Sequence, residues 1–232
     1  EKLGLIDVEK ASSVSGSRFS YLFGDLVKMQ FNLVSYAMNQ LSERGFNPTI
    51  PPVLVRENAL FGTGFFPDDS DQVYKIPNDD LFLVGTSEVS LAALHGDEIL
   101  DFNKLPIRYA GYSTCFRREA GTYGKDTTGI FRVHQFDKVE MFSFCSPEKS
   151  EEEHEFILSV EEEILQDLEI PYRVVDVCSG DLGSSAAKKF DIEAWIPSQN
   201  TYREVTSCSN TTDFQARRLN IRTKVEKDSA LL

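Results

Sequence analysis

The longest regular pattern of hydrophobic positions lies near the start of the chain. Its members recur at steps of three and four residues: Phe19, Leu22, Phe23, Leu26, Leu33, Val34, Ala37 and Leu41. This spacing places them on one face of a helix, and Gly45 follows where a helix C-cap is expected. The pattern therefore predicts a long amphipathic helix that ends before Gly45.

The segment 46–55 follows this helix and is rich in residues that favour strands. Pro48, Pro51 and Pro52 cannot donate hydrogen bonds to a neighbouring strand, so the segment is expected at the edge of a sheet or as an irregular strand. An apolar edge beside a long helix suggests that a second copy of the chain covers it.

Two β-hairpins are expected in the middle of the chain. Segments 74–76 and 81–84, joined by the turn 77–80, form the first, which leads into Gly85-Thr86-Ser87-Glu88 and a short helix. The second hairpin is larger, with arms at 107–118 and 130–144 and a connecting loop at 119–129.

The last third predicts a helix, three short strands and a closing helix. The acidic stretch 148–169 carries Phe156, Ile157, Val160, Ile164 and Leu168 on one side, which predicts a solvated surface helix. Strands are expected at 172–177, 192–196 and 202–207, and a helix near Asp213. Because consecutive hairpins need no crossover, this order predicts an α+β fold with a mainly antiparallel sheet flanked by helices. Residues 1–232 are expected to form one domain.

Composition and charge narrow the class of protein. The chain is 41% hydrophobic and 26% charged, which is typical of soluble globular proteins. It has no apolar run near the roughly 20 residues of a membrane helix and no signal-peptide pattern, so a cytoplasmic location is expected. The net charge of -13 has the wrong sign for binding nucleic acid through the whole surface, so a polyanionic partner must be held locally.

The four cysteines are Cys115, Cys145, Cys178 and Cys208. They lie far apart, without a C-x-x-C pair and without a histidine at ligand spacing. Buried or partly buried thiols are therefore expected, and no zinc site.

Polar side chains along the larger hairpin are the first candidates for chemistry. A side-chain period of two puts Arg117 and Glu119 on one face of the first arm. On the second arm it groups Arg132, His134, Phe136, Lys138 and Glu140. Ionic groups beside an aromatic ring suit the floor of a polar ligand site, although a salt-bridged, exposed sheet face produces the same pattern.

Glu204 and Ser207 are a second candidate, because a carboxylate close to a hydroxyl suits Mg²⁺ held mainly by phosphate oxygens. The chain lacks G-x-x-x-x-G-K-[ST], a G-x-G-x-x-G after a strand, and the kinase signatures. Its three histidines do not lie beside a plausible nucleophile, which argues against a triad hydrolase. A phosphate ligand would therefore be held by arginine and metal.

Four segments carry a resemblance to a known family. Residues 114–121, the loop after them and residues 131–140 resemble motif 2 of the seryl-tRNA synthetases, which are class II aminoacyl-tRNA synthetases. Residues 48–56 resemble motif 1, residues 85–88 the serine-binding TxE loop, and residues 202–210 with 214–218 the strand before motif 3. Motif 1 would then cover about residues 30–57 and motif 2 about residues 107–144 of a class II synthetase catalytic fold.

The resemblance implies a serine–tRNA ligase that activates L-serine with ATP and transfers the seryl group to the 3′ end of tRNA(Ser). Arg117 matches the catalytic arginine that bridges the serine carboxylate and the α-phosphate of ATP, a task for a planar bidentate donor. Glu119, Val133 and Phe136 match residues at the adenine, and Arg118 is expected near phosphates.

The remaining implied ligands lie in three places. Thr86, Ser87, Glu88 and Glu140, together with Arg117, match the serine-binding residues. Glu204 and Ser207 match ligands of Mg²⁺ and ATP, with Val205 and Thr206 between them in the ATP-contacting stretch, and Glu204 counts as catalytic. ATP is thus the implied substrate and Mg²⁺ the implied cofactor.

The resemblance also implies partners and missing parts. The loop 121–129 would meet the acceptor end of tRNA(Ser), with Arg118 and Lys125 available to phosphates, and motif 1 would form a homodimer. The family's coiled-coil arm would precede residue 1 and motif 3 would follow Leu232, so the chain is expected to be a truncated catalytic core.

Two alternatives stay open. A paralogue that loads a carrier protein would need a zinc site, for which the chain offers no paired ligands. A non-catalytic regulatory relative would have no chemical need for the full set Arg117, Phe136, Glu140, Glu204 and Ser207.

Overall fold

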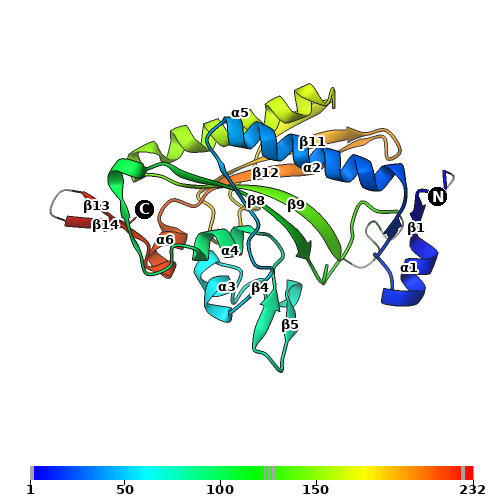
Figure 1. The fold of residues 1–232 in the computed structure, drawn as a ribbon, viewed down its shortest axis with the longest axis horizontal. Helices are drawn as coiled ribbons and strands as arrows, with labels where there is room; N and C mark the ends of the chain where they lie inside the picture. Colours follow the sequence, from blue (N-terminus) through cyan, green and yellow to red (C-terminus); the bar gives the residue numbers. More distant parts are fainter. Residues whose placement is uncertain (1–2, 123, 125, 127–128, 226–227, 232) are drawn as a thin grey trace. The chain divides into compact units, whose positions relative to one another are not determined.

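The computed structural model describes residues 3–122, 124, 126, 129–225 and 228–231, with the backbone alone at 225 and 228–231. The chain divides into two compact units. Unit 1 contains Glu1–Phe61, Phe65–Leu91 and Tyr109–Phe142, and unit 2 contains Gly62–Gly64, Ala92–Arg108 and Ser143–Leu232. Figure 1 shows the elements of both units.

Unit 1 begins with strand β1 (Ile6–Asp7), helix α1 (Val8–Ser15) and strand β2 (Tyr21–Leu22), which pairs antiparallel with β1. Asp7 caps α1, because its side chain accepts a hydrogen bond from the Lys10 N–H at 2.8 Å. The sequence pattern did not reveal α1.

The long helix α2 (Asp25–Glu43) follows (Figure 1). Gly45 adopts a left-handed φ of 84° just beyond its end, as expected for a helix stop. The predicted start of this helix is wrong. Leu22 lies in β2, and Gly24 has a φ of 57°, which is outside the helical region and separates Phe19, Leu22 and Phe23 from α2.

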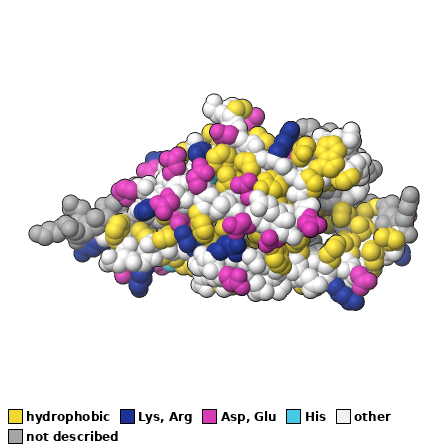
Figure 2. Space-filling model, turned by 90° about the horizontal axis from the view of Figure 1, so that it is seen from above, with side chains coloured by type: hydrophobic (Ala, Val, Ile, Leu, Met, Phe, Trp, Pro, Cys, Tyr) yellow, Lys and Arg dark blue, Asp and Glu magenta, His cyan; other side chains and the backbone are white. Residues whose placement is uncertain are grey.

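Much of the apolar surface of α2 faces outward in this chain. Leu41 is its buried residue, whereas Met29, Phe31 and Leu33 are 58%, 60% and 46% exposed. Hydrophobic side chains also reach the surface on the face drawn in Figure 2. The helix therefore has an apolar surface that this chain alone does not cover.

Two three-stranded sheets belong mainly to unit 1. Strand β8 (Ile107–Phe116) lies between β3 (Asn47–Thr49), with which it is parallel, and β9 (Gln135–Phe144). Strand β6 (Leu81–Leu83) lies between β4 (Leu54–Val55) and β5 (Tyr74–Ile76) and is antiparallel to both. The proline-bearing segment thus supplies edge strands β3 and β4, as predicted, and β5 and β6 form the first expected hairpin.

Short helices connect these strands. They are α3 (Glu57–Thr63), the 3₁₀ turn η1 (Ser70–Gln72) and α4 (Glu88–Ala93). Gly111 of β8 lies so close to α4 that a Cβ there would be 2.8 Å from Leu91 Cδ1 and 3.1 Å from Ser87 Oγ. A larger residue at this position would therefore require the side chains of Leu91 and Ser87 to move.

Unit 2 contains two further sheets. Strands β10 (Tyr172–Asp176), β11 (Lys188–Ile196) and β12 (Thr201–Asn210) form an antiparallel sheet in that order. Strand β13 (Arg222–Val225) pairs antiparallel with β14 (Asp228–Leu231) and parallel with β7 (Ile99–Asp101). Turns η2 (Phe102–Lys104) and η3 (Pro147–Lys149) and helices α5 (Ser150–Asp167) and α6 (Phe214–Leu219) complete the unit.

The core of unit 2 lies between α5 and the β10–β12 sheet. Leu158, Leu165, Ile192 and Cys208 are buried there, with Phe190 and other partly buried side chains packed against them. His154, 3% exposed, stacks on Phe190 and donates from Nε2 to the Cys208 carbonyl at 3.1 Å. This contact ties α5 to the backbone of β12.

The predicted surface helix forms as α5, but two of its carboxylates are buried instead of solvated. Glu153 and Glu161 are 7% and 9% exposed, whereas Leu168 is 39% exposed. Glu153 accepts from Arg108 Nε at 2.9 Å and from Ser143 Oγ at 2.8 Å. Burial opposes ionisation, but these bonds and the charge of Arg108 outweigh it and lower the pKa of the Glu153 carboxyl. A buried carboxylate persists here because it is paired.

The predicted fold class is confirmed, since most strand pairs are antiparallel and helices accompany them. Within the described residues the strands are divided among several two- and three-stranded sheets instead of one. In the same part of the chain, no helix combines the length and apolar character needed to cross a membrane.

Candidate active site

A buried hydroxyl and a carboxylate meet in unit 1 where α4 begins. Thr86, 2% exposed, donates from Oγ1 to Glu140 Oε2 at 2.6 Å. Lys138 Nζ donates to both groups, at 3.1 Å to Thr86 Oγ1 and 3.0 Å to Glu140 Oε2. Among the described residues both bonds to Glu140 fall on Oε2, which leaves Oε1 for an incoming donor.

The neighbours of Thr86 have different roles. Ser87 is fully buried and its hydroxyl is directed at the Gly111 carbonyl, at 3.4 Å. Glu88 begins α4, and its N–H donates to Thr86 Oγ1 at 3.2 Å. The side chain of Ser87 therefore serves the packing of α4 on β8, and only its backbone could meet a ligand.

Arg117 presents a cation just beyond the end of β8. Its Nε donates to the Gly85 carbonyl at 3.1 Å, and its guanidinium carbon lies 5.2 Å from the centre of the Phe136 ring. Within the described residues no hydrogen bond uses its two terminal nitrogens. One edge of the guanidinium is thus anchored, and the other is available for a bidentate anion.

The expected grouping of alternate residues on the larger hairpin is only partly correct. Phe136, Lys138 and Glu140 lie on β9, but this strand begins at Gln135 and not at 130, so Arg132 and His134 precede it. Arg117 and Glu119 lie beyond the end of β8, and Glu119 has a left-handed φ of 51°. Strand alternation therefore does not govern these four residues.

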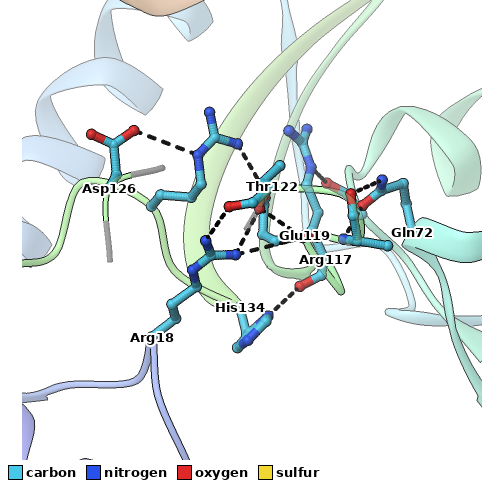
Figure 3. A network of polar contacts seen from close by, with 10 residues as sticks. Arg18, Gln72, Arg117, Glu119, Thr122, Asp126 and His134 are labelled. Carbon is cyan, nitrogen blue, oxygen red and sulfur yellow. Dashed lines mark hydrogen bonds and ion pairs between the residues drawn. The ribbon is translucent and has the colours of Figure 1, made fainter. Parts of the chain in front are cut away.

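A different interaction joins the two sides of the loop. Arg132 donates from Nη1 to Glu119 Oε2 at 2.6 Å, and Arg132 Nε lies 3.6 Å from Asp126 Oδ2. The Arg117 N–H donates to the His134 carbonyl at 2.9 Å, and His134 Nδ1 donates back to the Arg117 carbonyl at 2.8 Å (Figure 3). These bonds fix the backbone on both sides of the loop where β8 ends and β9 begins.

Two further residues that were predicted to contact ATP, Arg118 and Val133, are at least partly accessible to solvent. Arg118 is exposed, and its N–H donates to the Gln72 carbonyl at 2.8 Å. Val133 is half-buried between Arg132 and His134. Lys125, expected near phosphates, lies outside the described residues.

Asp137 of β9 connects the larger hairpin to α2 through hydrogen bonds. Its carboxylate accepts hydrogen bonds from Gln30 of α2, Tyr112 and Thr114 of β8, at 2.5, 3.1 and 2.8 Å. These hydrogen bonds tie α2 to β8, which ends just before Arg117, and to β9, which carries Glu140. The same contact and burial raise the pKa of the Tyr112 hydroxyl, burial being the larger cause.

Glu204, Val205, Thr206 and Ser207 lie on β12 in unit 2. Thr206 pairs with Ile192 and Glu204 with Glu193, so Val205 is the additional residue of a β-bulge. Side chains three residues apart would point to opposite faces of a regular strand. The bulge shifts the alternation by one, and both Glu204 and Ser207 are exposed whereas Cys208 is buried.

The donor set on this face suits one kind of metal ion. Lys189 Nζ lies 4.0 Å from Glu204 Oε1, and the Glu204 side chain is 55% exposed. One carboxylate and one hydroxyl are too few for a closed protein cage, but they fit Mg²⁺, which keeps waters and phosphate oxygens as ligands. Among the described residues, no group of three or more His, Cys, Asp or Glu is arranged to hold a metal ion.

Sequence reasoning missed several residues of these clusters as functional candidates. Arg18, Gln30, Gln72 and Asp137 come from segments whose meeting with the hairpin depends on the fold. Lys138 was grouped with Glu140 on the second arm of the hairpin but was given no role, although a cation next to a half-buried carboxylate on one strand face indicates a pair.

Comparisons with known proteins agree with one another. The family profile described as tRNA synthetase class II core domain (G, H, P, S and T) matches residues 73–230. The serine–tRNA ligase of Corynebacterium glutamicum is 57% identical over 226 residues, which is 97% of this chain and 54% of that protein. Serine–tRNA ligase 1 of Streptomyces avermitilis is 60% identical over 222 residues, covering 96% and 52%.

Solved structures show the same relationship. The seryl-tRNA synthetase of Pyrococcus horikoshii, complexed with ATP, matches with a TM-score of 0.95 at 53% identity and covers 99% of this chain and 51% of that one. The cytoplasmic serine–tRNA ligase of Naegleria fowleri, in complex with AMP, matches with a TM-score of 0.93 at 41% identity, covering 98% and 55%. The chain spans about half the length of the relatives it matches.

Proposed function

We propose that this chain, which belongs to the tRNA synthetase class II core domain family, is the catalytic core of an enzyme. The proposed enzyme activates L-serine with ATP and charges tRNA(Ser). The reaction joins the serine carboxylate to the α-phosphorus of ATP and releases pyrophosphate. Negative charge must therefore be stabilised at the α-phosphate and at the serine carboxylate.

Arg117 is the residue we assign to that charge. Its guanidinium is anchored through Nε on Gly85, and its two terminal nitrogens can donate in parallel to a carboxylate oxygen and a phosphate oxygen. A preorganised cation of this kind stabilises the transition state without reorganising during the reaction.

The adenine would lie against Phe136, whose ring already faces the Arg117 guanidinium. Stacking on an aromatic ring is favourable for a purine and independent of its polar groups. Glu119 and the backbone of Val133 would read the polar edge of the base, and Arg118 would meet phosphates. Arg132 orients the Glu119 carboxylate through their 2.6 Å contact.

The serine would be held by the Thr86–Glu140 cluster. Glu140 Oε1 and Glu88 supply carboxylate acceptors for the ammonium and hydroxyl groups of serine, and the buried Thr86 hydroxyl and the backbone of Ser87 bound the pocket. Lys138 neutralises part of the Glu140 charge. A pocket built from such groups rejects alanine strongly, because alanine would leave its buried polar atoms unpaired.

Glu204 and Ser207 are the residues we assign to Mg²⁺, with Val205 and Thr206 in the same ATP-contacting stretch. The ion would supply positive charge to the phosphate oxygens of ATP. The bulge at Val205 supports this assignment, because it turns the carboxylate and the hydroxyl to the same face.

We also propose that the loop 121–129 contacts the acceptor end of the tRNA and that the apolar surface of α2 forms the interface of a homodimer. We also propose a cytoplasmic location. The chain's net charge of -13 requires that tRNA contacts be local.

The observation that carries the proposal is the half-anchored guanidinium of Arg117 beside Phe136, within a chain 57% identical to a serine–tRNA ligase. The test is ATP–pyrophosphate exchange by the full-length protein with serine, threonine, alanine and glycine. Exchange with serine at least about 100-fold more efficient than with alanine is expected, because the pocket recognises a hydroxyl. Exchange that is equal for the four amino acids would refute the proposal.

A further inference from the structure

The base of the loop between β8 and β9 is held by a residue from far away in the sequence. Arg18 lies between α1 and β2, more than 100 positions before the loop. It donates from Nη1 to Thr122 Oγ1 at 2.7 Å and from Nη2 to the Thr122 carbonyl at 2.8 Å. Its Nη1 also lies 3.5 Å from the Glu119 carbonyl.

The contact is built into the fold of unit 1 at the backbone level as well. The Arg18 carbonyl accepts a hydrogen bond from the His134 N–H at 3.0 Å, and the Phe19 ring contacts the His134 ring at 5.3 Å. One short segment therefore holds both ends of the loop, Thr122 through a side chain and His134 through the main chain.

Gln72 holds the same stretch from the other side in the view of Figure 3. Its Oε1 accepts from the Ala120 N–H and its Nε2 donates to the Ala120 carbonyl, both at 3.1 Å. Its own carbonyl accepts from the Arg118 N–H at 2.8 Å. Residues 118–122 thus lie between two sets of directional bonds.

Glu119 needs this support because of its backbone conformation. Its φ of 51° is left-handed, which a non-glycine residue adopts rarely and keeps only when its surroundings fix it. The Thr122 hydroxyl, which Arg18 orients, donates to the Glu119 carbonyl at 2.7 Å. Arg18 itself has a φ of 63°, so it too adopts an uncommon backbone conformation.

We propose that Arg18 is a positioning residue that sets the Glu119 carboxylate, through Thr122 and the loop backbone, for contact with the base of ATP. This role rests on the proposed function, in which Glu119 reads the adenine. Arg18 does not touch the substrate, so its loss should weaken ATP recognition more than serine recognition.

The test compares Arg18→Met with Arg222→Met in the full-length protein. Met retains most of the aliphatic stem, and Arg222 is a half-buried arginine of unit 2 whose guanidinium bonds to Asn220. In pyrophosphate exchange, Arg18→Met should raise the KM for ATP on the order of 10-fold or more and change the KM for serine less than about 3-fold. Arg222→Met should change neither.

Amide hydrogen exchange tests the same inference without any catalytic activity. Exchange at residues 118–122 should become at least about tenfold faster in Arg18→Met and stay unchanged in Arg222→Met. Arg18→Lys replaces Arg18→Met if the latter does not fold, and it should show the same selective change to a smaller degree, because an ammonium lacks the fork that spans both Thr122 oxygens.

Unchanged amide hydrogen exchange at residues 118–122 in Arg18→Met would overturn the positioning role. Equal changes in the KM values for ATP and serine would overturn it as well. If the wild-type protein shows no serine-dependent pyrophosphate exchange, the proposed function fails, and hydrogen exchange still decides whether Arg18 orders the loop. The two failures are therefore distinguishable.

Discussion

Replacing Glu140 with Gln removes one negative charge from the proposed serine pocket at almost constant shape. In the structure, Oε2 accepts from Thr86 at 2.6 Å and from Lys138 at 3.0 Å. An amide in its place either turns its NH₂ toward these two donors or keeps an oxygen there that lacks the charge. In both cases the carboxylate is lost as a partner for the serine ammonium.

The expected magnitude follows from the kind of bond that is lost. A hydrogen bond to a charged group contributes about 1.5–3 kcal/mol, which corresponds to roughly 10- to 150-fold in kcat/KM for serine. The Glu140 bonds described above involve Thr86 and Lys138, so the KM for ATP should change less than about 3-fold.

The assay is steady-state pyrophosphate exchange with serine and ATP varied separately. Glu98→Gln, which changes an exposed carboxylate paired with His95, is the matched control and should be neutral. Equal losses for serine and ATP in Glu140→Gln would refute the assignment of this cluster to the amino acid.

Three further predictions concern other parts of the chain. Glu204→Gln should raise the Mg²⁺ concentration needed for half-maximal exchange on the order of 10-fold while leaving the KM for serine nearly unchanged, and an unchanged Mg²⁺ requirement would remove Glu204 from the metal site. Glu153→Gln should lower the free energy of unfolding by about 3 kcal/mol in urea titrations near neutral pH, because Arg108 loses its buried partner. Since the pKa of Glu153 is lowered, its contribution to stability is fully present above the ordinary pKa of a glutamate and is lost as the pH falls through the lowered pKa; a variant with the same acid sensitivity as the wild type would contradict this. Phe31→Glu should convert the proposed dimer to monomers in sedimentation at micromolar concentration, and an unchanged dimer would exclude the exposed face of α2 from the interface.

The elements that the sequence predicted well are those fixed by local chemistry. Pro48, Pro51 and Pro52 restrict their segment to sheet edges whatever the rest of the chain does, and Gly45 ends α2 through its own backbone freedom. The first hairpin follows from its turn residues and apolar arms.

The errors have more than one cause. Gly24 interrupts the apolar repeat, so α2 begins at Asp25 and does not include Phe19, Leu22 and Phe23, and the spacing of apolar residues alone does not show this break. Strand β9 starts at Gln135 because Arg132 and His134 bond across the loop to Glu119 and Arg117. These contacts join residues whose proximity depends on tertiary packing.

The candidate site also combines predictable and unpredictable residues. The resemblance named the candidates Arg117, Phe136, Glu140, Glu204 and Ser207, but it did not name the residues from other segments that hold the site in place. Arg18 lies more than 100 positions from Thr122, and no periodicity links the two residues. The bulge at Val205 depends on the register of β12 against β11, which a single strand does not encode.

The central claim is that the site recognises serine joined to adenylate, and the most direct measurement is calorimetric titration with non-hydrolysable aminoacyl-adenylate analogues. The full-length protein should bind the seryl analogue at least about 100-fold more tightly than the alanyl analogue, since only the former satisfies the polar atoms of the Thr86–Glu140 cluster. Arg117→Ala should abolish most of the affinity for the seryl analogue. Equal affinity for both analogues, or full affinity without Arg117, would contradict the account.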